Sequence, residues 1–222
     1  MSSASHPDFY AVACQEMLDS QLRRRGIQDP RVLDAMARMP RHEFVTDIYR
    51  AQAYDDHPIP IGEGQSISQP YIVAVTLQAL ALRPSDIVLE VGTGSGYQTA
   101  LLAALVLHVY SVERHADLAR QAEGALLRLG YGNTTVVAGD GSRGLLDHAP
   151  FDAIAVAAAA PFIPHSLLEQ LTEGGRMVIP VGPEGVQELL LVRKQDEQPV
   201  IQTLGSCRFV PLVGAQGYPS AW

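Results

Sequence analysis

The sequence predicts an α/β fold: a doubly wound, mostly parallel sheet of seven strands that follows an N-terminal helical extension. Short apolar runs typical of buried strands recur at intervals of about 20 residues from residue 87 onward, and stretches with helical periodicity fill most of the gaps. The first apolar run ends in a glycine-rich loop. Such a loop brings bare main chain to the edge where the parallel strands of an α/β sheet end.

The helices are predicted from apolar periodicity and from the residues that begin and end each pattern. They are expected at residues 8–25, 30–39, 71–82, 116–129 and 166–171. Gly26 closes the first helix. Asp29 can cap the second helix, whose first turn suits Pro30. A polar stretch rich in turn residues, 54–70, precedes the third helix.

Seven strands are predicted at residues 87–91, 109–112, 134–138, 152–157, 176–180, 188–192 and 207–212. Because strands alternate with helices, most of them are expected to be parallel, with helices over both faces. No clear helix separates the last two, which should form an antiparallel hairpin at one edge. The alanines at 157–160 are followed by Pro161, so they are predicted to end a strand and open a loop.

Length and composition fit one globular domain. The 222 residues, 47% of them apolar and 18% charged, can bury a substantial core. Residues 1–70 are expected to form the helical extension and an active-site loop, and residues 71–222 a Rossmann-like core. A formal charge of −8 argues against a nucleic-acid partner but leaves peptides open.

Targeting signals and cysteine patterns point to a cytoplasmic protein. Residues 1–6 lack the basic and apolar regions of a secretory signal, and the longest apolar run, 99–107, is too short to cross a bilayer. Cys14 and Cys207 form no metal-binding or disulfide pattern. We therefore expect a cytoplasmic monomer without a metal ion and without a membrane partner.

The glycine-rich loop distinguishes between cofactors. Gly92, Gly94 and Gly96 are spaced Gly-x-Gly-x-Gly, and Glu90 stands just ahead of them. A dinucleotide fingerprint would need Gly-x-Gly-x-x-Gly. The observed form is typical of methyltransferases that use S-adenosylmethionine (SAM), so these four residues are predicted to bind that cofactor.

Two further strand ends are predicted to complete the cofactor site. Glu113 ends the second strand of the core, where a carboxylate can accept hydrogen bonds from ribose hydroxyls. Asp140 and Gly141 end the third strand, where they can accept from and donate to an adenine ring. The plainer alternatives are a surface pair of Glu113 with Arg114 and an ordinary Asp-Gly turn. The register of all three elements favours cofactor binding.

Several segments carry patterns that a generic methyltransferase has no reason to share, and the most specific is the run Gln-Ser-Ile-Ser-Gln-Pro at 65–70. The others are 29–36, 40–45, 60–64, 97–100, 139–141, 149–154, 179–182 and 208–212. Through them the sequence resembles the protein-L-isoaspartate (D-aspartate) O-methyltransferase family over nearly its whole length.

The resemblance implies an activity and further site residues. The loop containing Ser66 and Ile67 is expected to lie over the cofactor, and the Ser68 hydroxyl to reach the reaction centre as the catalytic residue. An isoaspartyl residue would bind between this loop and residues 157–161. The implied reaction is methylation of the free carboxylate of isoaspartyl and D-aspartyl residues in peptides and damaged proteins, which begins repair through a succinimide. An ionised carboxylate needs no general base.

Three other functions stay open at this point. The acceptor could be the carboxylate of one dedicated peptide or of a small molecule. The chain could bind SAM without catalysis, although the complete set of site residues argues against it. A nicotinamide oxidoreductase is disfavoured by the glycine spacing.

Overall fold

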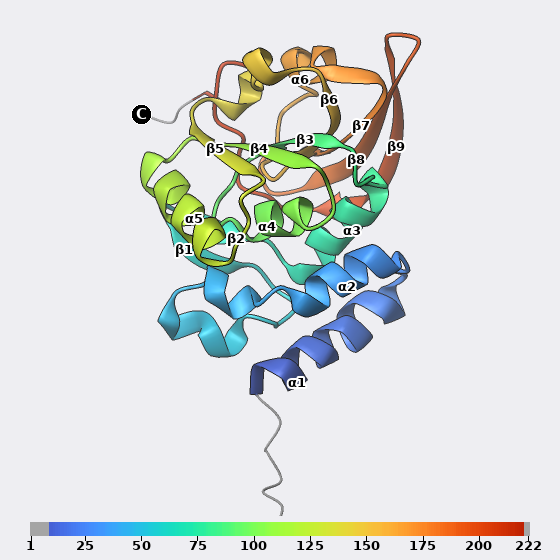
Figure 1. Ribbon diagram of the computed structural model, residues 1–222. Coiled ribbons are helices and arrows are strands. Elements are labelled where there is room, and N and C mark those ends of the chain that lie inside the picture. The colour runs from blue at the N-terminus through green and yellow to red at the C-terminus, as the bar shows by residue number, and fades with distance from the viewer. Residues whose placement is uncertain (1–8, 220–222) are drawn as a thin grey trace, which may run out of the picture.

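The computed structural model describes residues 9–219, so the segment in which no secretory signal is expected lies outside the described residues. A seven-stranded sheet runs in the order β5-β4-β3-β6-β7-β8-β9 (Figure 1). Its strands are β3 (Ile87–Val91), β4 (His108–Glu113), β5 (Thr134–Ala138), β6 (Phe151–Val156), β7 (Leu171–Val181), β8 (Gln187–Gln195) and β9 (Gln198–Cys207). The first five strands in this order are parallel, and β8 pairs antiparallel with β7 and with β9. The predicted doubly wound sheet with an antiparallel edge is confirmed.

Side chains alternate between two apolar clusters, one on each face of the sheet. Val88, Val109 and Val178 point to one face, and Leu89 and Ile179 to the other. Helices α3 (Pro70–Leu80), α4 (Tyr97–Ala103) and α5 (Ala116–Arg128) cover the first face, and α6 (His165–Glu169) packs on the second. Strands buried on both faces explain why the sequence runs were continuously apolar.

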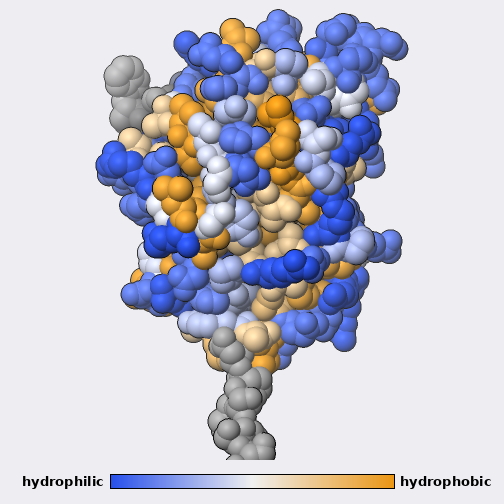
Figure 2. All heavy atoms as spheres, in the orientation of Figure 1, coloured by the Kyte–Doolittle hydropathy of each residue, from blue (hydrophilic) through white to orange (hydrophobic). Residues whose placement is uncertain are grey.

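The face of the molecule seen in Figure 2 carries both hydrophilic and apolar side chains. Figure 2 shows one face of the molecule, with hydrophilic side chains along its edges and a narrower band of apolar side chains along its middle. Within residues 9–219, no helix is both long enough and apolar enough to cross a membrane.

The N-terminal helices form a further layer beneath α3 and α4. The first helix begins as α1 (Phe9–Glu16), continues as a π-helical stretch (Met17–Leu22) and a 3₁₀ turn (Arg23–Arg25), and ends at Gly26 with φ 90°. Helix α2 (Pro30–Arg38) is capped by Asp29, whose carboxylate accepts from Arg31 N at 2.9 Å. Both predicted helix ends are thus confirmed.

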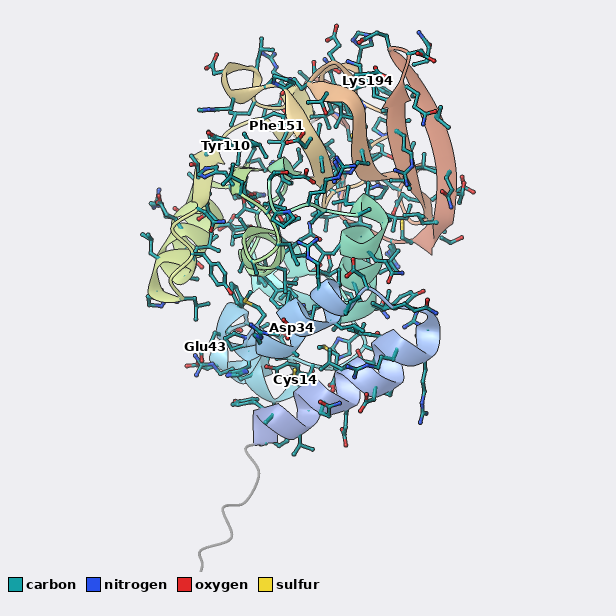
Figure 3. All side chains as sticks on the ribbon, turned by 45° about the vertical axis from the view of Figure 1, so that its right-hand side comes forward. Cys14, Asp34, Glu43, Tyr110, Phe151 and Lys194 are labelled. Carbon is teal, nitrogen blue, oxygen red and sulfur yellow. The ribbon has the colours of Figure 1, made fainter. Side chains whose placement is uncertain are left out.

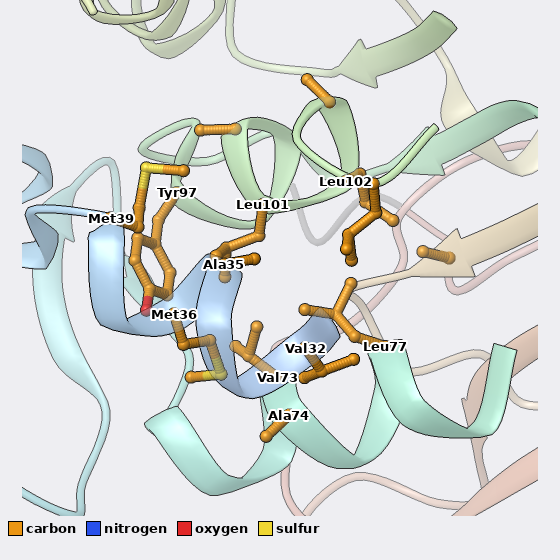
Figure 4. Close-up of a cluster of buried hydrophobic side chains, with 14 of the residues drawn as sticks. Val32, Ala35, Met36, Met39, Val73, Ala74, Leu77, Tyr97, Leu101 and Leu102 are labelled. Carbon is orange, nitrogen blue, oxygen red and sulfur yellow. The ribbon is translucent and has the colours of Figure 1, made fainter. Parts of the chain in front are cut away.

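The apolar side of α2 joins this layer to the sheet domain. Val32, Ala35, Met36 and Met39 lie against side chains of α3 and α4 (Figure 4). Figure 3 shows Cys14, Asp34 and Glu43 in this N-terminal part, apart from Tyr110, Phe151 and Lys194 of the sheet. Because the same buried cluster contains residues of α2 and of the sheet, the extension and the sheet share one core.

The turn-rich stretch contains a small hairpin that the sequence did not predict. Strands β1 (Ile59–Gly62) and β2 (Gln65–Ile67) pair antiparallel across Glu63 and Gly64. Both turn residues have positive φ, 51° and 68°, as a type I′ hairpin turn requires. The hairpin delivers residues 66–68 to the carboxyl edge of the sheet.

The last predicted strand is wrong in position. Strand β9 spans Gln198–Cys207, whereas residues 208–212 leave the sheet and contribute only an isolated bridge between Pro211 and Ala159. Nearly every residue of β9 is exposed, since it is an edge strand with one neighbour. Its sequence therefore shows no alternation of buried apolar and exposed polar positions, and even Val200 and Ile201 are about half exposed. The run after it serves another purpose, described below.

Candidate active site

A cleft opens where strands β3, β4 and β6 end, and we call it the first cleft. Strand β3 pairs with β4 on one side and β6 on the other, so the chain reverses its winding direction here. Ligands of doubly wound sheets bind at this switch point. The empty space at the first cleft is about 770 Å³, a volume that includes open solvent. Its lining includes residues 65–68, 91–95, 112–114, Gly141, 157–158 and 210–213.

The glycine loop approaches this cleft as predicted, but its three glycines have different tasks. Gly92 and Gly94 line the cleft at φ 94° and 54°. A Cβ on Gly92 would stand 3.4 Å from the Ala157 side chain. Gly96 does not line the cleft: it has φ 86°, and a Cβ there would meet Ala122 of α5 at 3.2 Å. The third glycine therefore permits close packing of two helices.

Glu113 lies at the edge of the first cleft, where the sequence predicted it. It is 5% exposed, and its two oxygens accept from the main-chain N–H groups of Gly94, at 2.9 Å, and His115, at 3.0 Å. Each carboxylate oxygen can accept another hydrogen bond. The carboxylate is thus held against the glycine loop and retains capacity for ligand hydroxyls.

Glu90 lies beneath the loop and does not line the cleft. It is fully buried and faces Ser111, its register partner on β4, which donates to it at 2.6 Å. Thr99 and Gln98 also donate to its carboxylate. Burial raises the pKa of Glu90 to about 7, although the bonds from Ser111, Thr99 and Gln98 oppose the rise. Of these partners, Gln98 reaches the cleft, so Glu90 acts on the lining through it.

Of the neighbours Asp140 and Gly141, only Gly141 lines the first cleft. Gly141 lines the first cleft, and a Cβ on it would come 2.6 Å from Val91 Cγ1. Asp140 lies outside the lining, where its carboxylate accepts from Ser142 and from Ala215 N at 2.8 Å. Burial opposes ionisation of Asp140, but these hydrogen bonds and the charge of Arg143 lower its pKa. In this structure Asp140 anchors the C-terminal segment.

A second cleft adjoins the first and is larger, with about 1670 Å³ of empty space that includes open solvent. Tyr71, Gln187, Phe209 and Tyr218 are among its lining residues. The two clefts share five lining residues: Ser66, Ser68, Ala157, Val210 and Pro211.

Ser68 stands at this shared border. Its hydroxyl has no hydrogen-bond partner among residues 9–219, and the side chain of Arg41 donates to its main-chain oxygen instead. A free hydroxyl between two clefts can donate to a ligand group that crosses from one to the other. Ser66 and Ile67 also line the first cleft, in keeping with the predicted position of this loop over a cofactor.

Part of the wall of the first cleft is formed by residues for which the sequence predicted no role in the site. The apolar residues 210–213 line the first cleft, and all but the last of them belonged to the strand predicted at 207–212. Tyr218 holds the end of this segment by donating to Gly182 O. Among residues 9–219, no group of three or more His, Cys, Asp or Glu side chains is arranged to hold a metal ion.

Sheet order, antiparallel edge and Gly-x-Gly-x-Gly loop together define the class of Rossmann-like, SAM-dependent methyltransferases. Residues 13–217 match the family model of protein-L-isoaspartate(D-aspartate) O-methyltransferase. The chain belongs to this family, which confirms the resemblance inferred from its motifs.

Individual relatives agree with the family match. A protein-L-isoaspartate O-methyltransferase of Koribacter versatilis is 56% identical over 220 residues, 98% of this chain and 99% of the relative. A solved protein-L-isoaspartate O-methyltransferase superposes with a TM-score of 0.83 at 29% identity, covering 92% of this chain and 67% of the other. A second, from Plasmodium falciparum in complex with S-adenosyl-L-homocysteine, gives 0.77 at 27% identity, covering 90% and 96%.

Proposed function

We propose that this chain transfers a methyl group from SAM to the free carboxylate of L-isoaspartyl and D-aspartyl residues in peptides and damaged proteins. The observation that carries the proposal is the meeting of two clefts at Ser68, in a chain that belongs to this family over nearly its whole length. One cleft suits a nucleoside cofactor and the other is large enough for a stretch of peptide.

The residues that line the first cleft suit SAM in their chemistry. Gly92 and Gly94 leave the main chain bare, and the absence of a side chain at Gly141 lets its main chain pack directly against Val91. The Glu113 carboxylate would accept from the ribose hydroxyls, and the apolar side chains of Val112 and Leu212 suit an adenine ring. SAM supplies an activated methyl group bonded to a sulfonium sulfur.

The residues at the border would position the acceptor and exclude water. A carboxylate is ionised at neutral pH, so it needs no general base to attack a methyl group. The Ser68 hydroxyl would donate to one carboxylate oxygen and hold the other toward the first cleft. Positioning of reacting atoms can lower the activation free energy by up to about 7–11 kcal/mol. The walls at Ala157 and Pro211, common to both clefts, would keep water from the reacting atoms.

Repair follows from the chemistry of the product. The methyl ester loses methanol when the neighbouring main-chain nitrogen attacks its carbonyl carbon, which closes a five-membered succinimide. Water then opens that ring, in part to an ordinary aspartyl linkage. We propose that the enzyme works in the cytoplasm, where its unpaired Cys14 and Cys207 thiols suit the reducing conditions, and as a monomer, because one chain lines both clefts.

The test compares two peptides of the same sequence that differ only in one isoaspartyl or aspartyl linkage. With radiolabelled SAM, the enzyme should label the isoaspartyl peptide and leave the aspartyl peptide unlabelled. Labelling of both, or of a small carboxylic acid alone, would point to a different acceptor. Binding of S-adenosylhomocysteine by calorimetry without any turnover would point to a non-catalytic homologue.

A further inference from the structure

Arg41 is a buried cation without an acidic partner. Its side chain is 0% exposed at the start of the 3₁₀ helix Arg41–Phe44. None of the ion pairs among residues 9–219 includes it. Burying an unpaired charge is costly, so such a residue needs compensation from the groups around it. Burial lowers the pKa of Arg41, but an arginine stays protonated at neutral pH.

The guanidinium ties three segments together. Nε donates to Ala53 O at 2.6 Å, and Nη2 donates to Ser68 O at 2.7 Å. Its central carbon lies 4.6 Å from the centre of the Tyr97 ring, which faces the cation. Tyr97 begins α4 directly after the glycine loop and lines the first cleft. One planar group therefore joins the N-terminal extension, the loop that contains Ser68 and the start of α4.

The bond to Ser68 is the contact that matters for the reaction. The Ser68 hydroxyl has no partner among the described residues, so nothing on the protein fixes that side chain directly. Its main-chain oxygen, in contrast, accepts a hydrogen bond from the charged guanidinium of Arg41. Such a bond is stronger and more directional than one between neutral groups. The direction of the hydroxyl is then set through the main chain.

We propose that Arg41 is a positioning residue for methyl transfer: it holds the main chain of Ser68 so that the hydroxyl points to the border of the two clefts. The stacking on Tyr97 links this loop to the start of α4. The inference rests on the proposed function, because Ser68 is the residue through which Arg41 acts.

A double-mutant cycle tests the coupling. Arg41→Lys keeps the charge but cannot make both fork contacts, so kcat/KM for the isoaspartyl peptide should fall about tenfold, chiefly in kcat. The dissociation constant for S-adenosylhomocysteine should change less than about threefold. In Arg41→Lys/Ser68→Ala, kcat/KM should fall no more than about twofold below Ser68→Ala alone. Arg41→Gln, which keeps a planar donor, takes the place of the lysine variant if that one does not fold.

Arg176 provides the matched control. It is also buried and donates to three main-chain oxygens, and it lines neither cleft. Unlike Arg41 it has an acidic partner, Asp86. Arg176→Lys should lower the unfolding temperature and leave kcat unchanged. If the fall in kcat/KM of the double variant were the product of the falls in Arg41→Lys and Ser68→Ala, the two residues would act independently and the proposal would be overturned. A loss of kcat in Arg176→Lys as large as that in Arg41→Lys would also overturn it.

Amide hydrogen exchange gives a readout that does not depend on activity. The Ile72 and Val73 amides donate to Gln69 O, next to Ser68, and should exchange about tenfold faster in Arg41→Lys but not in Arg176→Lys. Unchanged exchange would refute the role of Arg41 in holding the loop. Failure of the unmodified enzyme to methylate the isoaspartyl peptide would instead refute the proposed function and leave this measurement valid.

Discussion

Replacing Glu90 by glutamine is expected to remove a pH-dependent cost from the stability of the fold. Glu90 is fully buried under the glycine loop, and burial raises its pKa from 4.5 to about 7. Glutamine has the same shape and one oxygen that can still accept from Ser111 or Thr99, but it carries no proton that titrates. The two proteins should therefore respond differently to pH.

The sign follows from proton binding. Below pH 4.5 the carboxyl group is protonated in both the folded and the unfolded chain, and it adds no pH dependence. Between pH 4.5 and 7 the folded chain holds the proton more tightly, so the free energy of unfolding falls as pH rises. Above pH 7 the full cost is present, about 3 kcal/mol. Relative to the unmodified protein, Glu90→Gln should gain that amount between pH 4.5 and 8.

Thermal unfolding of both proteins at pH 5 and pH 8, without cofactor, measures this gain. From pH 5 to pH 8 the gain is about 2.5 kcal/mol, because part of the cost is already present at pH 5. For a domain of this size it corresponds to a rise of roughly 5–10 °C in the difference between the melting temperatures of the two proteins. Glu123→Gln removes a carboxylate from the exposed side of α5 and controls for the loss of one negative charge. If the difference between Glu90→Gln and the unmodified protein were the same at both pH values, Glu90 would be ionised throughout and the reasoning would fail.

Three further substitutions test the site. Ser68→Ala should lower kcat/KM about ten- to a hundredfold, because one hydrogen bond to a charged group is lost. Binding of S-adenosylhomocysteine should be unchanged. A loss near a millionfold would mean that Ser68 forms a covalent intermediate. Gly96→Ala should lower the free energy of unfolding in urea by about 1–3 kcal/mol more than Gly130→Ala, because both have positive φ but only Gly96 faces Ala122. Equal losses would exclude the contact with α5. Gly141→Ala should weaken binding of S-adenosylhomocysteine about tenfold by colliding with Val91, and Val91→Ala/Gly141→Ala should regain part of it; unchanged affinity would remove Gly141 from the site.

The parallel core could be predicted because its strands are buried on both faces. Runs such as Ile87–Val91 and Thr134–Ala138 have the bounds expected from the sequence. Strand β9 could not be found in this way, since an exposed edge strand needs no apolar pattern and this one contains Pro199 and Gly205. The predicted strand 207–212 lies at the border of the two clefts instead, and its residues line them.

The site divides along a similar line. Local patterns were enough to place Gly92, Gly94 and Glu113 at the first cleft, because these residues lie where strands end and their position follows from the fold. Whether Asp140 faces a ligand or the C-terminal segment depends on Ala215, 75 positions away in the chain. The contacts of Arg41 with Ala53, Ser68 and Tyr97 likewise join segments that no periodicity relates. Such roles come from tertiary packing alone.

The wall at residues 210–213 has a consequence for biosynthesis. A ribosome has already translated the glycine loop, Glu113 and Gly141 when this wall is still inside the exit tunnel. A nascent chain at that stage holds the polar groups of the first cleft but lacks one of its apolar sides. Nascent chains held on the ribosome by an added C-terminal linker should therefore bind S-adenosylhomocysteine only when the linker is long enough for residues 210–213 to leave the tunnel.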